Sequence, residues 1–425
     1  WVAGGGLTAF ASLADGLTNV GRLAGLVASV LMLLQVLLMA RIPIVEQAWG
    51  QDELARVHRL VGFTSFHLMV AHIVLVVAGY NVADTGRGFV GTLVDQVLNG
   101  PGVLLATAGT VALVMVVITS VRVARRRLRY ESWHLLHLYA YLGTGLALPH
   151  QLWTGADFTS SPVASVFWWS VYGATLTAVL VFRVLLPVVR SHRHRLVVSH
   201  VVQESATVTS VHLRGRDLHL LTVRGGQFFS WRFLDGQGWT RANPYSLSAA
   251  PDGHSLRLTA ASVGDSSSRL ATLRPGTRVL VEGPYGRLHA GVKVARRNVL
   301  IGAGIGITPL RALLEELPPG HDETVVIHRV GRPGDAILAH ELVELAQARG
   351  GRVHGVIGPR DPQRGGWQPA GAPLPDHAAL LRLVPDIAQR DVFVCGPPAW
   401  IDHVVEAALD AGVPRAAVHT ERFSY

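Results

Sequence analysis

Three histidines lie within one apolar stretch of membrane-spanning length, residues 57–80. Ionisable side chains inside a membrane are costly and mark functional sites by default. His58 and His72 are fourteen residues apart, which places them within roughly 40° of each other on a helix and about 20 Å apart along it. His67 falls on the opposite face. Neutral imidazole can be an axial ligand of heme iron, so the spacing suits two stacked hemes; one metal ion or ordinary core histidines are the alternatives.

A second apolar stretch, residues 133–152, also carries three histidines. Its His137 and His150 are thirteen residues apart, which leaves them about 140° apart on a straight helix. Pro149 has no backbone N–H to donate, so a kink there would bring both onto one face. We therefore expect two cross-helix pairs at matched depths. The expected metal ligands are His58, His72, His137 and His150, whereas His67 and His134 are expected to have structural or heme-propionate contacts.

Five apolar segments are each long enough to cross a bilayer. They are, approximately, residues 20–40, 57–80, 102–121, 133–152 and 164–187. Arginines cluster within residues 122–129 and 190–195, and such clusters mark the cytoplasmic side, whereas the alternate loops contain only Arg87. This topology places residue 1 outside, so we expect a sixth span before it.

The composition supports this interpretation. Only 16% of the 425 residues are charged and 49% are hydrophobic, which excludes an ordinary soluble enzyme. The net charge of +9 comes from arginines beside apolar spans, so the expected partner is the lipid bilayer and not nucleic acid. Cys395 is the only cysteine, which excludes an intrachain disulfide and a cysteine-based metal site.

From about residue 195 the pattern changes to short alternating strands with Gly and Pro turns, which predicts a small antiparallel β-barrel. An aromatic side chain and a hydroxyl are neighbours on the strand RANPYSLSAAP at 241–251. The aromatic could stack on a planar ring, and the hydroxyl could hydrogen-bond the edge of that ring. VGDSSSRL at 263–270 suits an anion such as pyrophosphate. VEGPYG follows at 281–286. An ordinary surface strand is the alternative for the first motif.

The last third begins with an apolar strand, a glycine-rich turn and a helix, NVLIGAGIGITPLRALLEEL at 298–317. A strand, glycines and a helix N-terminus in this order form a phosphate cradle. The strands TVVIHRV and DVFVCGPPAW continue a Rossmann-like α/β unit. Arg329 and Arg360 follow the second and third strands, and either could bind the 2'-phosphate of NADPH or be a solvated surface arginine. We expect NADPH, with NADH as the alternative.

The paired histidine helices resemble the ferric reductase and NADPH oxidase superfamily, and the later motifs resemble the ferredoxin-NADP reductase module that is fused to that heme domain. The resemblance implies a multi-domain membrane protein. Residues 1–190 would be a helical di-heme domain, 191–290 an FAD-binding β-barrel and 291–425 an NAD(P)-binding α/β domain. His58 and His137 would hold the inner heme b, and His72 and His150 the outer one.

The resemblance also implies roles for single residues of the barrel. Tyr245 would stack on the isoalloxazine, Ser246 would bond near its N5, and Pro244 would shape the strand. Asn243 stands where many flavin reductases have arginine, which leaves Arg241 as the candidate for the flavin phosphate. The residues facing the pyrophosphate would be Gly264, Ser267 and Ser268.

The resemblance implies that the nicotinamide nucleotide is bound by the glycine-rich turn and by residues 395–397, Cys-Gly-Pro, which we call the CGP element. These residues are Gly302, Gly304, Gly306, Thr308, Pro309, Cys395, Gly396 and Pro397. The final ERFSY resembles a segment that covers the flavin until nicotinamide displaces it, through Glu421, Phe423 and Tyr425. The residues expected nearest to hydride transfer are Cys395, Ser246, Phe423 and Tyr425.

The implied function is a transmembrane oxidoreductase. Electrons would pass from cytoplasmic NADPH through FAD and two b-type hemes to an acceptor outside a bacterial-type cytoplasmic membrane. We expect O2 as the acceptor, giving superoxide. Val76 stands where related oxidases tend to carry a further histidine, so a ferric chelate or an external partner protein remains an alternative acceptor. The flavin and nicotinamide motifs argue against a heme carrier without catalysis.

Overall fold

The chain folds as two compact units in the computed structural model. One consists of residues 1–45 and 53–183, and the other of residues 46–52 and 184 onward. The described residues are 1, 6–84, 86–121, 130–159, 161–236, 241–318, 324–361 and 365–422.

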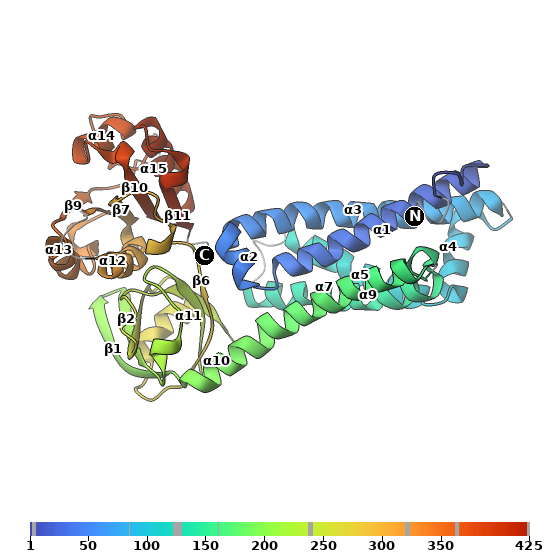
Figure 1. Cartoon of the computed structure of the whole chain (residues 1–425), viewed down its shortest axis with the longest axis horizontal. Coiled ribbons are helices and arrows are strands. Elements are labelled where there is room, and N and C mark those ends of the chain that lie inside the picture. Colours follow the sequence, from blue (N-terminus) through green and yellow to red (C-terminus); the bar gives the residue numbers. More distant parts are fainter. Residues whose placement is uncertain are drawn as a thin grey trace. The chain divides into compact units, whose positions relative to one another are not determined.

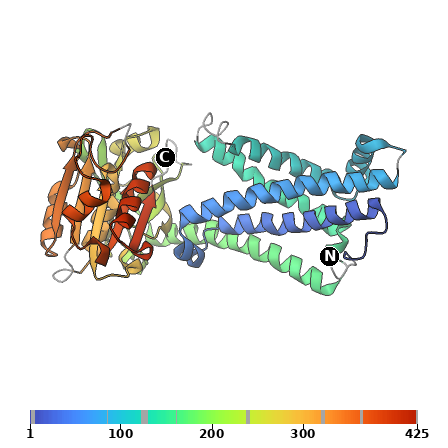
Figure 2. The same ribbon diagram turned by 90° about the horizontal axis from the view of Figure 1, so that it is seen from above.

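Helices build the first unit (Figures 1 and 2). They are α1 (Leu13–Leu38), α3 (Gln51–Ala83), α4 (Gly88–Asn99), α5 (Val103–Ser120), α7 (Tyr130–Thr154), α8 (Ala156–Thr159) and α9 (Pro162–Val179), while α2 (Pro43–Trp49) spans the boundary between the units. From α9 the chain continues through a π-helical segment, Leu180–Leu185, into α10 (Leu186–His194).

Four helices in the described part of the chain are long and apolar enough to cross a membrane. They are Leu13–Leu38, Glu53–Ala83, Val103–Ser120 and Pro162–His194. The sequence predicted five such segments, and the fourth of them, 133–152, forms most of α7 but is not among these four helices. Three histidines and Gln151 reduce the hydropathy of this helix, which explains the difference.

Glycines allow the helices of this unit to approach one another closely. A methyl group on Gly109 of α5 would lie 2.6 Å from the carbonyl oxygen of Gly143 on α7, and one on Gly143 would lie 2.9 Å from that of Gly109. A methyl group on Gly21 of α1 would lie 2.9 Å from the Val76 side chain of α3. Small residues at such contacts let helices pack in lipid, where the hydrophobic effect does not drive association.

Two three-stranded antiparallel sheets begin the second unit, and we call residues 197–285 the two-sheet region. One sheet has the order β1 (Val197–Ser205), β2 (Val208–Arg214), β5 (Ser255–Ala261), and the other β4 (Asn243–Ser246), β3 (Phe228–Phe233), β6 (Val279–Tyr285). Their core centres on fully buried Phe229 and Trp231. Isolated bridges at Val197–Arg278 and Leu247–Leu258 connect the sheets, so the described strands form two joined sheets and a closed barrel is not shown.

A five-stranded parallel sheet follows, and we call residues 297–422 the parallel-sheet region. Its order is β11 (Val418–Arg422), β10 (Arg390–Gly396), β7 (Arg297–Ala303), β8 (Thr324–Val330), β9 (Arg352–Ile357). Helices α12 (Ile307–Glu316) and α13 (Ala339–Gln347) pack in one core, and α14 (Asp376–Leu383) and α15 (Pro398–Asp410) in another (Figure 1). β8 and β10 are buried along their whole length, as expected of a parallel sheet covered on both faces. This arrangement is consistent with the predicted Rossmann-like domain.

The glycine contact between α5 and α7 gives a first prediction. Gly109→Ala should lower the free energy of unfolding by about 1–3 kcal/mol, because the new methyl group overpacks against a backbone carbonyl. The measurement is unfolding in detergent followed by circular dichroism.

Gly145→Ala on α7 is the matched control, because nothing lies within 4 Å of the position of its methyl group. It should be neutral or slightly stabilising, since alanine favours helix more than glycine does. Equal stability of the two variants would contradict the role of the Gly109 contact.

Candidate functional site

The structure brings together the inner pair of histidines that the spacing predicted. The ring centroids of His58 on α3 and His137 on α7 are 6.0 Å apart, with the ring planes at 60°. His58 Nδ1 lies 3.1 Å from the carbonyl oxygen of Gln35, and His137 Nδ1 lies 3.3 Å from Ser120 Oγ. The Nδ1 atom of each ring is therefore engaged, and Nε2 is left for another partner.

The outer pair repeats this arrangement. The ring centroids of His72 and His150 are 6.3 Å apart, with the planes at 51°. His72 Nδ1 lies 2.8 Å from the carbonyl oxygen of Gly21, and His150 Nδ1 lies 2.8 Å from Thr154 Oγ1. His72 also fits closely against α1, because a methyl group on Gly25 would lie 2.6 Å from His72 Nδ1.

The geometry of both pairs suits a planar, metal-containing group whose metal is coordinated by one imidazole on each face. A metal–nitrogen bond of about 2 Å on each side, plus the two ring radii, gives a centroid separation of about 6 Å. Each pair supplies two ligands, the number that an iron porphyrin leaves open. Ligating histidines usually bond a carbonyl or other polar group through the second ring nitrogen, as all four do here. The residues present therefore fit heme.

His67 lies apart from both pairs. It is exposed, and its Nδ1 bonds the carbonyl oxygen of Phe63 in its own helix at 2.8 Å. Its ring packs on Phe63 and Phe66. The bond to helix backbone is one of the contacts expected for His67, but its exposed ring is not the buried core histidine that the sequence favoured.

The tyrosine–serine motif lies on β4, paired with β3. Tyr245 is opposite Phe229 and packs partly against the sheet core, and its carbonyl oxygen accepts a bond from Trp231 Nε1 at 2.8 Å. Buried Ser246 is opposite Phe228. The neighbours Asn243 and Pro244 are opposite Trp231 and Ser230 on the same strand pair.

The Gly–Ser motif forms a short turn, α11 (Asp265–Ser268). Ser267 Oγ accepts bonds from the backbone N–H groups of Val263 and Gly264 at 3.0 and 3.1 Å, so this hydroxyl closes the turn. Ser268 is exposed, and Arg269 forms an ion pair with Asp235. Ser268 is thus the more accessible hydroxyl of the motif.

The glycine-rich turn meets β10 at very close range. A methyl group on Gly306 would lie 2.3 Å from the carbonyl oxygen of Cys395, and one on Gly302 would lie 3.0 Å from the Cα of Ile307. Gly304 has φ +52°, in the left-handed region that glycine adopts easily. Thr308 is buried and donates to the Ile305 carbonyl oxygen at 2.9 Å. Glycines are therefore required for the turn to sit against the CGP element.

Glu421 connects this element with the two-sheet region. On β11 it is paired with Cys395 of β10. A methyl group on Gly286 would lie 3.1 Å from both Glu421 Oε2 and the Phe228 ring, and Phe228 is the residue opposite Ser246. The expected flavin strand and the expected nicotinamide elements therefore converge within one unit.

Two family descriptions match separate parts of the chain. Residues 24–148 match "Ferric reductase like transmembrane component", and residues 300–406 match "Oxidoreductase NAD-binding domain". The chain joins a ferric-reductase-like membrane domain to an NAD-binding oxidoreductase domain. This is the fused architecture that the sequence resemblance implied.

Curated relatives match the second half. The chain is 28% identical over 236 residues to the ferredoxin reductase component of 3-ketosteroid-9-alpha-monooxygenase from Rhodococcus rhodochrous, which covers 54% of this chain and 64% of that protein. It is 26% identical over 240 residues to a flavohemoprotein from Xylella fastidiosa (strain 9a5c), covering 55% of this chain and 59% of that protein. The chain thus spans less than two thirds of either relative.

Solved structures align with the same half. The FAD/NAD-binding domain of nitric oxide dioxygenase from Vibrio cholerae O1 biovar El Tor is 25% identical, with 54% of this chain and 99% of that chain covered and a TM-score of 0.43. A ferredoxin NADP+ reductase from Neisseria gonorrhoeae is 19% identical, with 54% and 97% covered and a TM-score of 0.44.

The two arginines predicted for a 2'-phosphate differ in their surroundings within the NAD-binding domain. Arg329 is 7% exposed and donates to the carbonyl oxygens of Trp367, Gly358 and Pro359 at 3.2, 2.8 and 3.2 Å. With a further bond to the carbonyl oxygen of Val330, four of its five N–H groups are engaged, which leaves one for a phosphate oxygen. Arg360 is exposed, so it is the better placed of the two.

Some expected features lie outside the described residues: Phe423, Tyr425 and the arginine cluster at 122–129. Other functional contacts were not foreseen. The backbone carbonyl oxygens of Gln35 and Gly21 bond His58 and His72. The sequence could not identify them as acceptors, since every residue has a backbone carbonyl. The ion pairs of Arg257 with Glu341 join residues 84 positions apart, and neither belongs to a motif.

Cys395 gives a second prediction. It is completely buried, and burial, with the nearby Glu421 carboxylate, raises the pKa of its thiol well above the ordinary value. Thiolate is the reactive form, so maleimide at pH 8 should label less than about a tenth of the native protein and all of the denatured protein. Mass spectrometry measures the labelling.

His340→Cys serves as the control, because the side chain at this position on α13 is 87% exposed. It should add one rapidly labelled thiol in the native protein. Labelling of Cys395 at the same rate would show that the CGP element is open to solvent.

Proposed function

We propose that this protein carries electrons from NADPH, through FAD and two b-type hemes, to an acceptor on the outer side of the membrane. The observation that supports this most is the pair of cross-helix histidine contacts, with centroids 6.0 and 6.3 Å apart and every Nδ1 engaged elsewhere. Heme iron, when bound, supplies one-electron chemistry between two stable oxidation states. The contribution of the protein is to hold and orient each ring.

The second half would supply the electrons. Its glycine-rich turn, Gly304–Gly306, begins helix α12 and presents backbone N–H groups where a nucleotide phosphate would bind. The names of the relatives, a ferredoxin reductase component and a flavohemoprotein, support a flavin and nicotinamide module here. Exposed Arg360 would favour NADPH over NADH through a charge-assisted bond to the 2'-phosphate. The arginines at 190–195 support a cytoplasmic location for this half.

Molecular oxygen is the proposed acceptor. A hollow of about 230 Å³ lies where α1 and α3 carry Asp15, Arg22 and Tyr80, and it would admit a small molecule. Arg22 is held there by Asp157 at 2.7 Å. The carbonyl oxygen of Gly21, the residue before Arg22, bonds His72. The hollow is therefore lined in part by α1, the helix that supports the outer histidine pair.

A ferric chelate is the second candidate, favoured by the match of residues 24–148 to a ferric-reductase-like component. An external protein partner is a third acceptor. It predicts little turnover on either small acceptor alone.

The histidine assignment gives a third prediction. His72→Leu should lower the heme content from about two to about one per chain, because the outer group loses an axial ligand. His67→Leu, on the same helix, should retain both. Heme is quantified by the pyridine hemochrome absorbance of the purified protein. Loss of heme in His67→Leu but not in His72→Leu would refute the ligand set.

The acceptor is tested with purified full-length protein and NADPH. Oxygen consumption with a superoxide-sensitive probe, measured with and without a ferric chelate, should show superoxide that superoxide dismutase removes. NADPH oxidation that occurs only with ferric chelate would replace oxygen by iron as the acceptor.

A further inference from the structure

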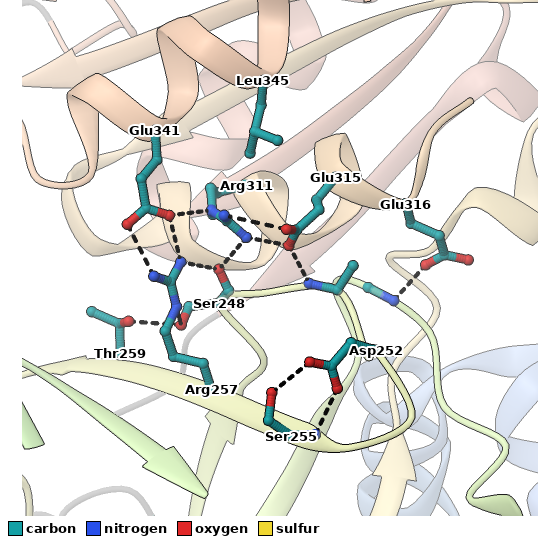
Figure 3. Close-up of polar contacts among 12 residues, drawn as sticks. Ser248, Asp252, Ser255, Arg257, Thr259, Arg311, Glu315, Glu316, Glu341 and Leu345 are labelled. Carbon is teal, nitrogen blue, oxygen red and sulfur yellow. Dashed lines mark hydrogen bonds and ion pairs between the residues drawn. The ribbon is translucent and has the colours of Figure 1, made fainter. Parts of the chain in front are cut away.

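Three charged side chains meet where the two-sheet region packs on α12 and α13 (Figure 3). Arg257 of β5 donates through both terminal nitrogens to the carboxylate oxygens of Glu341 on α13, each at 2.9 Å. Nε of Arg311 on α12 lies 2.7 Å from Glu341 Oε2. Arg257 and Arg311 are only 9% and 7% exposed, so both guanidinium groups are largely removed from water, whereas the side chain of Glu341 is 32% exposed. We call these three residues the charged cluster.

Both arginines of the charged cluster also hold Ser248. The carbonyl oxygen of Ser248 accepts bonds from Arg257 Nη2 at 2.8 Å and from Arg311 Nη1 at 3.2 Å. The hydroxyl of Ser248 accepts from Arg257 Nε at 3.1 Å and from Thr259 at 2.7 Å. Ser248 comes two residues after Ser246, so its backbone position is tied to that of the expected flavin strand.

α12 holds the two-sheet region at two further backbone positions. The N–H of Ala250 donates to Glu315 Oε2 at 2.6 Å, and the N–H of Gly225 donates to Glu316. Arg311 forms an ion pair with Glu315, which keeps that carboxylate in place. Ala312 of the same helix is fully buried in the core of the two-sheet region.

The same helix begins at the glycine-rich turn. Arg311 is five residues beyond Gly306, about 7.5 Å along a helix at 1.5 Å per residue. A helix of this length moves as a rigid rod, so a shift at Arg311 displaces the turn. Buried ion pairs contribute little net stability compared with apolar packing, and their best attested role is to specify one arrangement over others.

We propose that Arg257, Arg311 and Glu341 are positioning residues that set the distance between the nicotinamide and the flavin. This proposal rests on the proposed function. In the step concerned, one C–H bond of the dihydronicotinamide breaks, its hydrogen leaves with both electrons, and one N–H bond forms on the flavin. Such a step needs reacting atoms about 3–3.5 Å apart, and a misplacement of 1 Å can cost about 10²-fold in rate.

The test is Glu341→Gln in the full-length protein, which keeps the side-chain size and removes the charge that both arginines share. Anaerobic stopped-flow bleaching of the flavin by NADPH should slow at least about tenfold, with the KM for NADPH and the FAD content unchanged. Hydrogen exchange at the Ala250 amide should quicken, since Arg311 loses its partner on α13 and then holds Glu315, the acceptor of that amide, less firmly. This second measurement needs neither cofactor turnover nor an acceptor.

Glu344→Gln is the matched control, because this residue lies one turn further along α13, its side chain is 65% exposed and it pairs with exposed His340. It should behave as wild type in both assays. Arg311→Lys keeps the charge without the planar fork and should slow bleaching less than Glu341→Gln. It provides a second, milder variant if Glu341→Gln does not fold.

Bleaching at the rate of Glu344→Gln in folded Glu341→Gln and Arg311→Lys would overturn the proposal, even if their melting temperatures fell, because the charged cluster would then be only structural. No bleaching in the wild-type protein would instead refute the proposed function. The exchange rate at Ala250 would still report on the contacts of the charged cluster.

Discussion

The hydrogen bond between His72 Nδ1 and the carbonyl oxygen of Gly21 is the contact on which the membrane half depends. It can form only because α1 and α3 approach closely at Gly21 and Gly25, where any side chain would collide with α3. In hydrocarbon every polar atom needs a partner within the protein, so an imidazole without this bond would be costly to bury. Because the bond engages Nδ1, it leaves Nε2 as the nitrogen available for a ligand role, in a ring whose centroid lies 6.3 Å from that of His150.

Close backbone approach is equally decisive in the second half. Gly306 lets the glycine-rich turn meet Cys395, and Gly225 lets a loop of the two-sheet region meet α12, where a methyl group would lie 2.3 Å from the Ala312 carbonyl oxygen. In both units, therefore, glycines bring elements together and polar bonds then fix their orientation. The proposed electron path relies on these close approaches and fixed orientations, because cofactor chemistry depends on positions that the protein imposes.

Matched depth along two apolar helices predicted the histidine pairs, and motif order predicted the strand–turn–helix of the nucleotide domain. Helical periodicity alone was not enough, because it left His137 and His150 about 140° apart. Other features depend on tertiary contacts that no local pattern encodes. Arg329 was expected just after a strand, where a phosphate ligand could stand, yet it lies within β8 and is buried against carbonyl groups. The described strands form two joined sheets and do not show the closure of the predicted barrel, since strand alternation specifies pairing faces but not closure. Arg311 and Glu341 meet through the packing of two helices.

In the proposed function, this one chain contains the whole path from nucleotide to heme. The most direct measurement is anaerobic mixing of the purified full-length protein with NADPH, followed at flavin and heme wavelengths together. The flavin should bleach first, and heme with the spectrum of bis-histidine b-type iron should then become reduced. Flavin bleaching with no change in heme absorbance, or a purified protein without heme, would contradict it.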